Sequence, residues 1–164
     1  MKLYYDIFLT PLGRFAAAVD ETGALAGAGF GGREALPRWA HELTVDPQAV
    51  AITRRQIEEY LAGQRREFTL HLAPRGTPFQ QWVWAELRKI AFGQTRSYGQ
   101  LAADAGKPGG ARAIGQAVGS NPICLVIPCH RVVAADGSLG GFAYGVEMKR
   151  CLLELERTGQ ERCS

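Results

Sequence analysis

The stretch Ile127-Pro128-Cys129-His130-Arg131-Val132-Val133 decides how the rest of this chain is interpreted. It places a thiol, an imidazole and a guanidinium side by side, between the apolar run 124–127 and two valines. Short apolar runs of this kind predict buried strands. Pro128 fixes φ and removes a backbone donor, so we expect the chain to turn or kink there. A strand, a kink and a second strand would present the sulfur of Cys129 at an edge instead of in the core.

The chemistry of this stretch depends on the state of the Cys129 thiol. Most free cysteines are small, buried, hydrophobic residues. Here His130 and Arg131 follow immediately, and a base or a cation beside sulfur favours the nucleophilic thiolate. Adjacent residues of an extended strand face opposite ways, so a contact between Cys129 and His130 requires a bend at Pro128 or a bridging water. A carboxylate should orient the histidine, and on the residues alone Glu154 and Glu156 are equal candidates.

Length and composition allow a folded core and give no sign of a membrane protein. The chain has 164 residues, of which 46% are hydrophobic, which suits one domain or two small ones. No apolar run approaches the ~18 residues of a membrane span, and the N-terminus lacks the apolar core of a secretory signal. We therefore expect a soluble, cytoplasmic protein with no membrane contact.

Charge divides the chain into two parts. Pro74-Arg75-Gly76 is the best linker candidate, which predicts domains at residues 1–74 and 75–164. The first part carries eight basic and nine acidic side chains, net −1, and the second carries eleven and seven, net +4. A basic second part suggests an anionic partner there, although ordinary surface charge explains the imbalance equally well.

The cysteines and glycines give no sign of a metal or cofactor. None of the four cysteines has the C-x-x-C spacing of a zinc site, and we expect no disulfide framework. Cys151 is expected in the core and Cys163 in the tail, while Cys124 either packs in the core or faces a substrate. The glycine-rich loop 134–142 lacks a phosphate-loop lysine and a G-x-G-x-x-G motif, so no nucleotide cofactor is expected.

The first part of the chain is predicted to be a small α/β scaffold without chemistry of its own. Residues 2–9, 14–19 and 24–30 alternate with turn signals and predict an antiparallel meander of three strands. A helix is expected over 33–43, although Pro37 weakens it. Asp46-Pro47 predicts the start of another helix that ends at Gly63. Phe68 to Leu72 alternates as a strand does.

The second part is predicted to be mostly helical. Thr77 and Ser97 each begin a capping box, which predicts helices from Pro78 to Gly93 and from Tyr98 to Ala105. A turn over 106–110 leads to a third helix over 111–119, and the last two of these helices predict a helix-turn-helix. Helix 111–119 has small residues and one arginine, which suits a sequence-tolerant contact with a minor groove. A final helix is expected over 146–156, with Met148, Cys151, Leu152 and Leu155 facing inward.

The cysteine stretch resembles a known family signature. Pro128-Cys129-His130-Arg131-Val132-Val133 is similar to the active-site motif of the O6-alkylguanine-DNA alkyltransferases, also called methylated-DNA–protein-cysteine methyltransferases, and the resemblance runs from about Thr77 to Glu156. It implies an α/β protein with a ribonuclease H-like N-terminal domain (a small antiparallel sheet with a flanking helix) and a mostly helical, winged helix-turn-helix-like C-terminal domain. It implies a monomer that binds double-stranded DNA containing O6-alkylguanine. Some members of the family carry a structural zinc in the N-terminal domain, but this sequence offers no ligand set for one, so we expect no metal and no cofactor.

The resemblance also implies the reaction. A methyl or larger alkyl group passes from O6 of guanine, or from O4 of thymine, to Cys129, once and irreversibly. The target base sits inside a duplex, so it must be flipped out at a cost of a few kcal/mol.

The resemblance assigns roles residue by residue. Tyr98 would crowd the phosphate of the flipped nucleotide and protonate the departing guanine, and Arg112 would fill the gap in the base stack. Ala143 stands where many relatives have serine. The full assignment is catalysis by Cys129, His130, Glu156, Tyr98 and Asn121; DNA binding by Arg112, Tyr98, Ala111, Gly115, Ser97 and Arg131; and a substrate pocket of Gly140, Gly141, Phe142, Ala143 and Lys149.

Three other functions fit parts of the pattern. A Cys-His thiol hydrolase would use the same side chains, but such enzymes usually draw their histidine from a distant segment. A non-enzymatic protein that recognises alkyl lesions without repairing them would lack the reactive cysteine. A transcription factor with an incidental cysteine would discriminate strongly between undamaged sequences. The presence of Cys129 favours the alkyltransferase.

Overall fold

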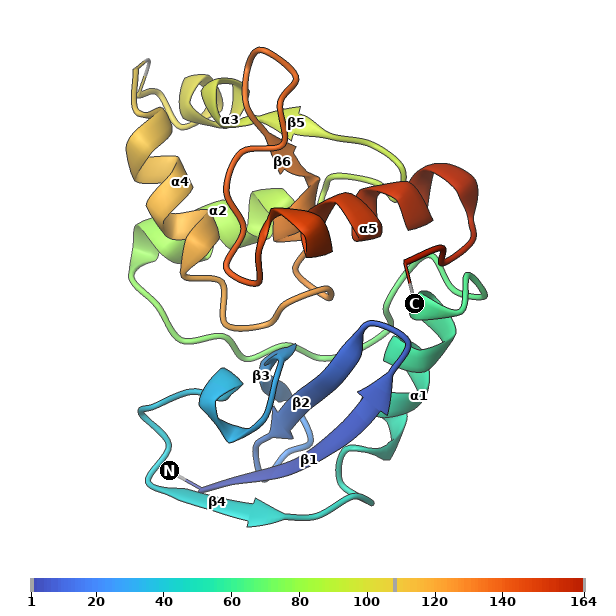
Figure 1. Ribbon diagram of the computed structural model, residues 1–164. Helices are drawn as coiled ribbons and strands as arrows, with labels where there is room; N and C mark the ends of the chain where they lie inside the picture. The colour runs from blue at the N-terminus through green and yellow to red at the C-terminus, as the bar shows by residue number, and fades with distance from the viewer. Residues whose placement is uncertain (1, 108, 164) are drawn as a thin grey trace.

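A four-stranded sheet with strand order β3-β2-β1-β4 forms the base of the N-terminal half (Figure 1). The computed structural model describes residues 2–107 and 109–163. The strands are β1 (Lys2–Thr10), β2 (Gly13–Val19), β3 (Leu25–Phe30) and β4 (Glu42–Val45). The predicted antiparallel meander of the first three strands is confirmed. β4 was not predicted, and it pairs parallel with β1.

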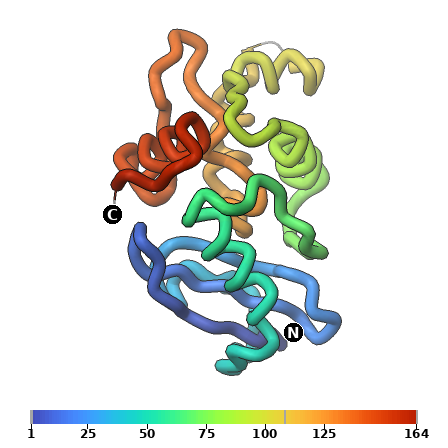
Figure 2. The backbone as a smooth tube through the Cα atoms, turned by 90° about the vertical axis from the view of Figure 1, so that its right-hand side faces the viewer, coloured from blue at the N-terminus to red at the C-terminus, as the bar shows by residue number. Residues whose placement is uncertain are grey.

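Both faces of this sheet are covered. Helix α1 (Ala51–Leu61) crosses one face (Figure 2), where Ile57 and Tyr60 join Phe8 and Phe15 in the main core. The other face buries Leu3 and Tyr5 under the segment that follows β3, in a second, smaller apolar cluster. The sheet is therefore buried on both sides, which explains the nearly continuous apolar runs of β2 and β3.

Three predictions for this half were wrong. The helix expected over 33–43 is a single 3-10 turn, η1 (Arg33–Ala35), because Pro37 cannot continue it. Asp46 accepts a hydrogen bond from the amide of Ala49 (3.1 Å) and closes a turn, and α1 begins only at Ala51. The segment 68–72 forms no strand; it makes one isolated bridge, between Leu72 and Leu25.

The free edge of β3 joins the two halves of the molecule. The amide of Ala28 donates to the carbonyl of Pro122 (2.9 Å), and the amide of Cys124 donates back to the carbonyl of Ala28 (2.9 Å). The segment that leads to Cys129 thus extends the N-terminal sheet by a short bridge between Ala28 and Ile123. This pairing fixes the cysteine segment from outside its own half of the chain.

The C-terminal half is mostly helical, as predicted. Its elements are α2 (Pro78–Leu87), β5 (Arg96–Ser97), α3 (Tyr98–Asp104), α4 (Ala111–Gly119), η2 (Cys129–Arg131), β6 (Val132–Val133) and α5 (Val146–Thr158). Both predicted capping boxes are confirmed, with Thr77 and Ser97 accepting from the amides of Gln80 and Gln100. Helices α3 and α4 pack together as a helix pair; Pro108, in the predicted turn between them, lies outside the described residues.

Helix α5 buries polar side chains that the apolar pattern did not indicate. Leu152 and Leu155 are fully buried, as expected, whereas Met148 and Cys151 are only partly buried. Lys149 and Glu156 lie on the buried face as well. Charged residues are rarely buried without a partner, so these two positions point to a site beneath α5.

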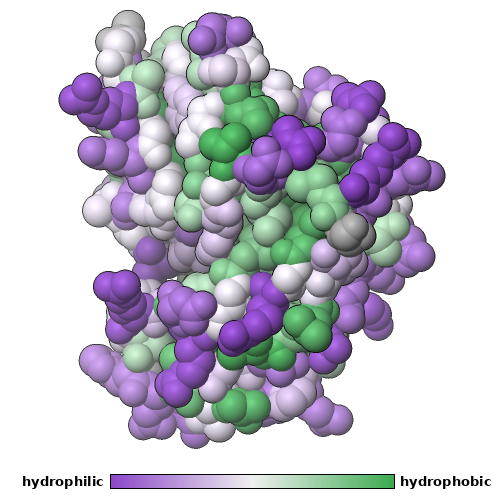
Figure 3. All heavy atoms as spheres, in the orientation of Figure 1, coloured by the Kyte–Doolittle hydropathy of each residue, from purple (hydrophilic) through white to green (hydrophobic). Residues whose placement is uncertain are grey.

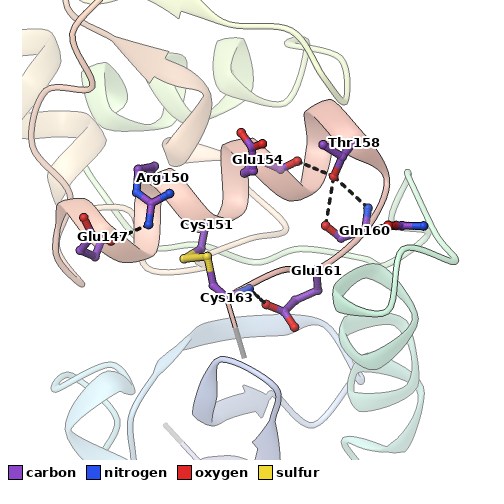
Figure 4. The surroundings of a disulfide bond; sticks show 8 residues. All are labelled: Glu147, Arg150, Cys151, Glu154, Thr158, Gln160, Glu161 and Cys163. Atoms are coloured by element: carbon purple, nitrogen blue, oxygen red, sulfur yellow. Dashed lines mark hydrogen bonds and ion pairs between the residues drawn. A yellow bond between two sulfur atoms is a disulfide. The ribbon is translucent and has the colours of Figure 1, made fainter.

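A disulfide between Cys151 and Cys163 contradicts the expectation of unpaired cysteines (Figure 4). The chain reverses after α5 because Gly159 adopts the left-handed conformation, with φ 75°, that glycine favours. The tail then runs back along α5 and brings Cys163 to Cys151. Spacing alone gave no sign of this pairing, because it depends on the reversal at the end of the helix.

Among the described residues, no helix combines the length and apolar character needed to cross a bilayer. On the face shown in Figure 3, hydrophilic side chains cover much of the upper and lower parts, and apolar residues gather across the middle.

Candidate active site

The cysteine segment is a turn followed by a 3-10 helix, and the predicted strand over 124–127 was wrong. Cys124 and Ile127 bridge to each other across this turn, and Leu125 between them has a φ of 73°, which non-glycine residues rarely adopt. After Pro128, residues 129–131 form η2. Successive side chains of a 3-10 helix point about 120° apart, so Cys129 and His130 face different surroundings, and only β6 remains of the predicted second strand.

Asn121 holds this turn in place. Its side-chain amide donates to the carbonyl of Ile127 (2.8 Å), and its side-chain oxygen accepts from the amide of Ile123 (2.9 Å). The same side chain also lowers the pKa of the Cys129 thiol. One residue at the end of α4 therefore connects the helix pair to the candidate nucleophile.

Cys129 lies in surroundings that favour its thiolate. The residue is 7% exposed. The hydrogen bond from Cys124 is the largest influence that lowers the pKa of Cys129; burial opposes it, and Asn121 and the charge of Lys149 lower the pKa further. The net pKa is below that of an ordinary thiol, which increases the fraction of nucleophile at neutral pH.

Glu156 is the centre of a buried network behind Cys129. Its carboxylate lies 2.7 Å from Nε2 of His130 and accepts from Nε (2.9 Å) and Nη2 (2.9 Å) of Arg131. It also accepts from the amide of Gly93 (3.2 Å). Burial alone would raise the pKa of Glu156, but the bonds and charges of His130 and Arg131 hold that pKa well below its usual range. Glu154, the alternative carboxylate, pairs with Arg157 instead.

His130 has the properties of a neutral base. It is fully buried, and burial lowers its pKa despite the nearby carboxylate. A neutral imidazole that donates from Nε2 to Glu156 leaves its Nδ1 lone pair free. Within the described residues Nδ1 is buried without a hydrogen-bond partner. The ring is thus oriented by Glu156, with one basic nitrogen available.

A cavity of about 680 Å³ opens in front of Cys129. Its walls come from the cysteine segment, from the helix pair and from the loop between β6 and α5. They comprise Tyr98, Ala111, Arg112, Gly115, Gln116, Val118, Gly119, Asn121, Cys124, Cys129, Gly141, Phe142, Ala143 and Tyr144. The mixture of aromatic, small and apolar residues suits a flat, largely apolar ligand.

Lys149 ties the loop over the cavity to the cysteine segment. Its ammonium donates to the carbonyls of Val132 (2.6 Å) and Gly141 (3.1 Å) and lies 5.8 Å from the ring of Tyr98. Burial lowers the pKa of Lys149 to about 8. Gly140 packs against the same tyrosine so closely that an added Cβ would lie 3.0 Å from Cε2.

Comparison with known proteins identifies the family. Residues 3–74 match the model of the 6-O-methylguanine DNA methyltransferase ribonuclease-like domain, and residues 78–158 match that of the 6-O-methylguanine DNA methyltransferase DNA binding domain. A methylated-DNA–protein-cysteine methyltransferase of Methanosarcina acetivorans is 40% identical over 157 residues, which are 94% of this chain and 98% of the relative. The chain belongs to the 6-O-methylguanine DNA methyltransferase family.

Solved members of this methyltransferase family share the fold. The crystal structure of Mycobacterium tuberculosis OGT in complex with DNA is 39% identical, covers 96% of this chain and 94% of its own, and superposes with a TM-score of 0.87. The O6-methylguanine-DNA methyltransferase of Pyrococcus kodakaraensis is 26% identical, covers 94% and 98%, and gives 0.61. The predicted fold class is therefore confirmed.

The methyltransferase cavity gathers most of the predicted site residues, with exceptions. Behind or beside its lining lie His130, Glu156, Ser97, Arg131, Gly140 and Lys149. The structure contradicts the DNA-binding role expected of Arg131, because its guanidinium is buried against Glu156 and donates to the carbonyl of Ile90 (2.6 Å). The hydroxyl of Ser97 accepts from the amide of Gln100 as the cap of α3.

Two residues that sequence reasoning passed over also belong to the site. Tyr60 on α1 donates to Glu156 (2.5 Å) and lies 3.3 Å from Nε2 of His130, so the N-terminal half reaches the buried network. Its helical spacing with Ile57 indicated only a core residue. Tyr144 lines the cavity beside Phe142. Neither position carries a local sequence signal, because each role depends on how distant elements pack.

Proposed function

We propose that this protein repairs alkylated DNA by direct reversal, moving an alkyl group from O6 of guanine in duplex DNA to the sulfur of Cys129. The observation that carries the proposal is a thiol of lowered pKa in the wall of a 680 Å³ cavity, backed by a buried histidine–carboxylate pair. The names of the relatives, methylated-DNA–protein-cysteine methyltransferase, support the same activity.

The arrangement supports an in-line displacement. A water bridging Nδ1 of His130 and the Cys129 thiol would carry the proton of the thiol to the imidazole, and Glu156 would stabilise the imidazolium. The thiolate then attacks the alkyl carbon, a C–S bond forms, and the C–O bond breaks with its electron pair moving to O6 of guanine. Burial raises the pKa of Tyr98, which keeps its proton available to neutralise the departing guanine.

The cavity and the helix pair support base flipping. Ala111 and Gly115 on α4 allow close approach to a duplex, and the exposed Arg112 stands at the cavity, where it would replace the extruded base. Phe142 and Gly141 offer apolar and backbone contacts to a purine. Ala143 has no hydroxyl for O6, so its backbone amide is the donor we assign there. Activity on O4-alkylthymine stays a prediction.

The product is a thioether, and this supports a single turnover. The mechanism above contains no step that breaks the new C–S bond. Each molecule would therefore act once. We assign residues 75–164 to DNA binding and alkyl transfer and residues 1–74 to their support; action as a monomer in the cytoplasm also stays a prediction.

The test is to incubate the protein with a duplex containing O6-methylguanine and to measure its intact mass. We expect a gain of one methyl group, localised to Cys129 by peptide mapping, and a stoichiometry of one per molecule. An undamaged duplex is the control. Sustained turnover would contradict the single-use mechanism, and binding without any mass gain would indicate a protein that only recognises lesions.

A further inference from the structure

A second thiol shares the cavity with the nucleophile. Cys124 and Cys129 both line it, both are reduced, and they are 1% and 7% exposed. Each thiol shifts the pKa of the other, as neighbouring groups do. The mechanism proposed above gives Cys124 no chemical step, so this buried thiol beside a reactive sulfur lacks an explanation.

The backbone brings these two sulfurs together. Leu125, in the left-handed conformation, reverses the chain directly after Cys124, and the bridge to Ile127 closes the turn. The amide of Cys129 donates to the carbonyl of Ile127 (2.8 Å). Leucine rarely adopts this strained conformation, and such strain is concentrated at functional sites. Here it directs both thiols into one cavity.

The two thiols also differ in protonation, as a nucleophile and a second thiol should. Burial raises the pKa of Cys124, and the bond to Cys129 and the negative charge of Cys129 raise it further. Cys129 therefore loses its proton more readily than Cys124 does. Oxidation of Cys129 to a neutral species would remove that charge, so Cys124 would ionise more readily at the moment when its attack is needed.

We propose that Cys124 is a resolving thiol that converts oxidised Cys129 into a reducible Cys124–Cys129 disulfide. The inference shares Cys129 with the proposed function but requires only that its thiolate reacts with a peroxide, not that it accepts an alkyl group from DNA. It makes Cys124 a modification site whose co-substrates are a peroxide and, for the return step, a small dithiol.

The chemistry balances in two steps. The thiolate of Cys129 and hydrogen peroxide, with one proton, give the sulfenic acid and one water. The Cys124 thiolate then attacks the sulfenic sulfur; the S–S bond forms, and hydroxide leaves and takes up the proton that Cys124 gave up. The two sulfurs must approach to about 2.05 Å to form the bond, and the dithiol later returns two electrons and two protons.

A disulfide of this kind would preserve a protein that can act only once. Low-pKa, accessible thiolates are oxidised first, and without a partner they proceed to sulfinic and sulfonic acids, which are irreversible in most proteins. Each such event would remove one repair molecule without repairing any DNA. A neighbouring thiol stops the oxidation at a stage that cellular dithiols reverse.

The chain offers a clean assay. Cleavage after Arg112 and Arg131 releases residues 113–131 as one peptide that holds both thiols, while Cys151 and Cys163 fall in other peptides. After treatment of the full chain with hydrogen peroxide, we expect this peptide to lose two hydrogen atoms in mass. Dithiothreitol should restore that mass and also restore methyl acceptance from DNA.

Two variants test whether Cys124 is the thiol that protects Cys129 from irreversible oxidation. In Cys124→Ser we expect peroxide to add two or three oxygen atoms to Cys129. The fraction of methyl acceptance that dithiothreitol recovers should fall several-fold. Each variant is compared with its own untreated sample. The matched control, the double variant Cys151→Ser/Cys163→Ser, removes the disulfide outside the cavity without creating a free thiol, and it should recover as the natural protein does. Equal recovery in Cys124→Ser, or no loss of hydrogen from the peptide, would overturn the inference. If untreated protein accepts no methyl group yet the disulfide forms, the proposed function fails and this inference stands.

Discussion

At the scale of single residues, Glu156 connects more of the site than any other residue described above. Its carboxylate is hydrogen-bonded by four residues: His130, Arg131, Gly93 and Tyr60. A buried anion of this kind is stable only together with its donors, because removing one charged group leaves the opposite charge buried without compensation. Glu154, two residues earlier, makes only an ion pair with Arg157 on the surface of α5.

Glu156→Gln should therefore be far more damaging than Glu154→Gln. We expect the first to lower the free energy of unfolding by about 3–5 kcal/mol, because Arg131 remains buried without its counter-charge. The second should change it by about 0.5 kcal/mol or less. Urea unfolding measures both. Methyl transfer by folded Glu156→Gln should slow by about 10²-fold or more, since His130 loses its orienting acceptor; similar losses in the two variants would contradict the network.

The same network predicts instability in acid. The folded pKa of His130 lies below its ordinary value of 6.5 and that of Glu156 below 4.5. At a pH below each ordinary pKa, the group binds a proton in the unfolded chain but not in the folded protein, so the free energy of unfolding falls as the pH is lowered. Urea titrations should show a decline that begins near pH 6.5 and steepens below 4.5. A Glu156→Gln variant should lose the lower part of this decline.

At the scale of elements, the loop between β6 and α5 positions Tyr98 through glycine. Gly140 and Gly137 both have positive φ, 72° and 87°, but only Gly140 touches the tyrosine, and nothing lies within 4 Å of a Cβ added at Gly137. Substitutions at these two glycines therefore distinguish the effect of backbone strain from the effect of contact with Tyr98.

Gly140→Ala should slow methyl transfer, and Gly137→Ala should not. Both should lose about 1–2 kcal/mol of stability, because alanine is strained at positive φ. In Gly140→Ala the new methyl group also displaces the ring of Tyr98, so the transfer rate measured at saturating DNA should fall further than stability explains. Equal rates in the two variants would show that this contact does not matter.

Elements with strong local patterns could be predicted from sequence, and elements made by tertiary contacts could not. The three alternating strands and the two capping boxes at Thr77 and Ser97 carry their own signals. β4 has no such signal, because it forms by pairing with β1. The apolar run after Ile123 predicts a strand. It forms a loop instead, because Leu125 adopts a left-handed conformation and the side chain of Asn121 hydrogen-bonds across the turn. The periodicity of a sequence does not report the φ angle of a single residue.

At the scale of the whole molecule, the N-terminal half takes part in the active site. Tyr60 on α1 reaches Glu156, and the edge of β3 holds the segment before Cys129. Sequence reasoning identified Cys129 and His130 from one signature and Asn121 from the wider family resemblance, but it treated residues 1–74 as support alone. A tyrosine in the apolar stripe of a helix does not reveal where its hydroxyl will point.

Tyr60→Phe should test this connection between the halves. Loss of a hydrogen bond to a buried carboxylate should lower the free energy of unfolding by about 1.5–3 kcal/mol. Methyl transfer should also slow, because Glu156 would then hold His130 less firmly. The control is Tyr5→Phe, another buried tyrosine of the same half that packs on the opposite face of the sheet. An equal effect of the two changes on the transfer rate would contradict the connection.

The backbone ladder between Ala28 and Cys124 has a consequence for recognising spent molecules. An alkyl group on Cys129 enlarges a buried side chain, and the segment that leads to it is hydrogen-bonded to the sheet through the amides of Ala28 and Cys124. Amide deuterium exchange at Ala28 and Cys124 should therefore accelerate once the protein has reacted. The edge of β3 would then report whether the molecule has been used.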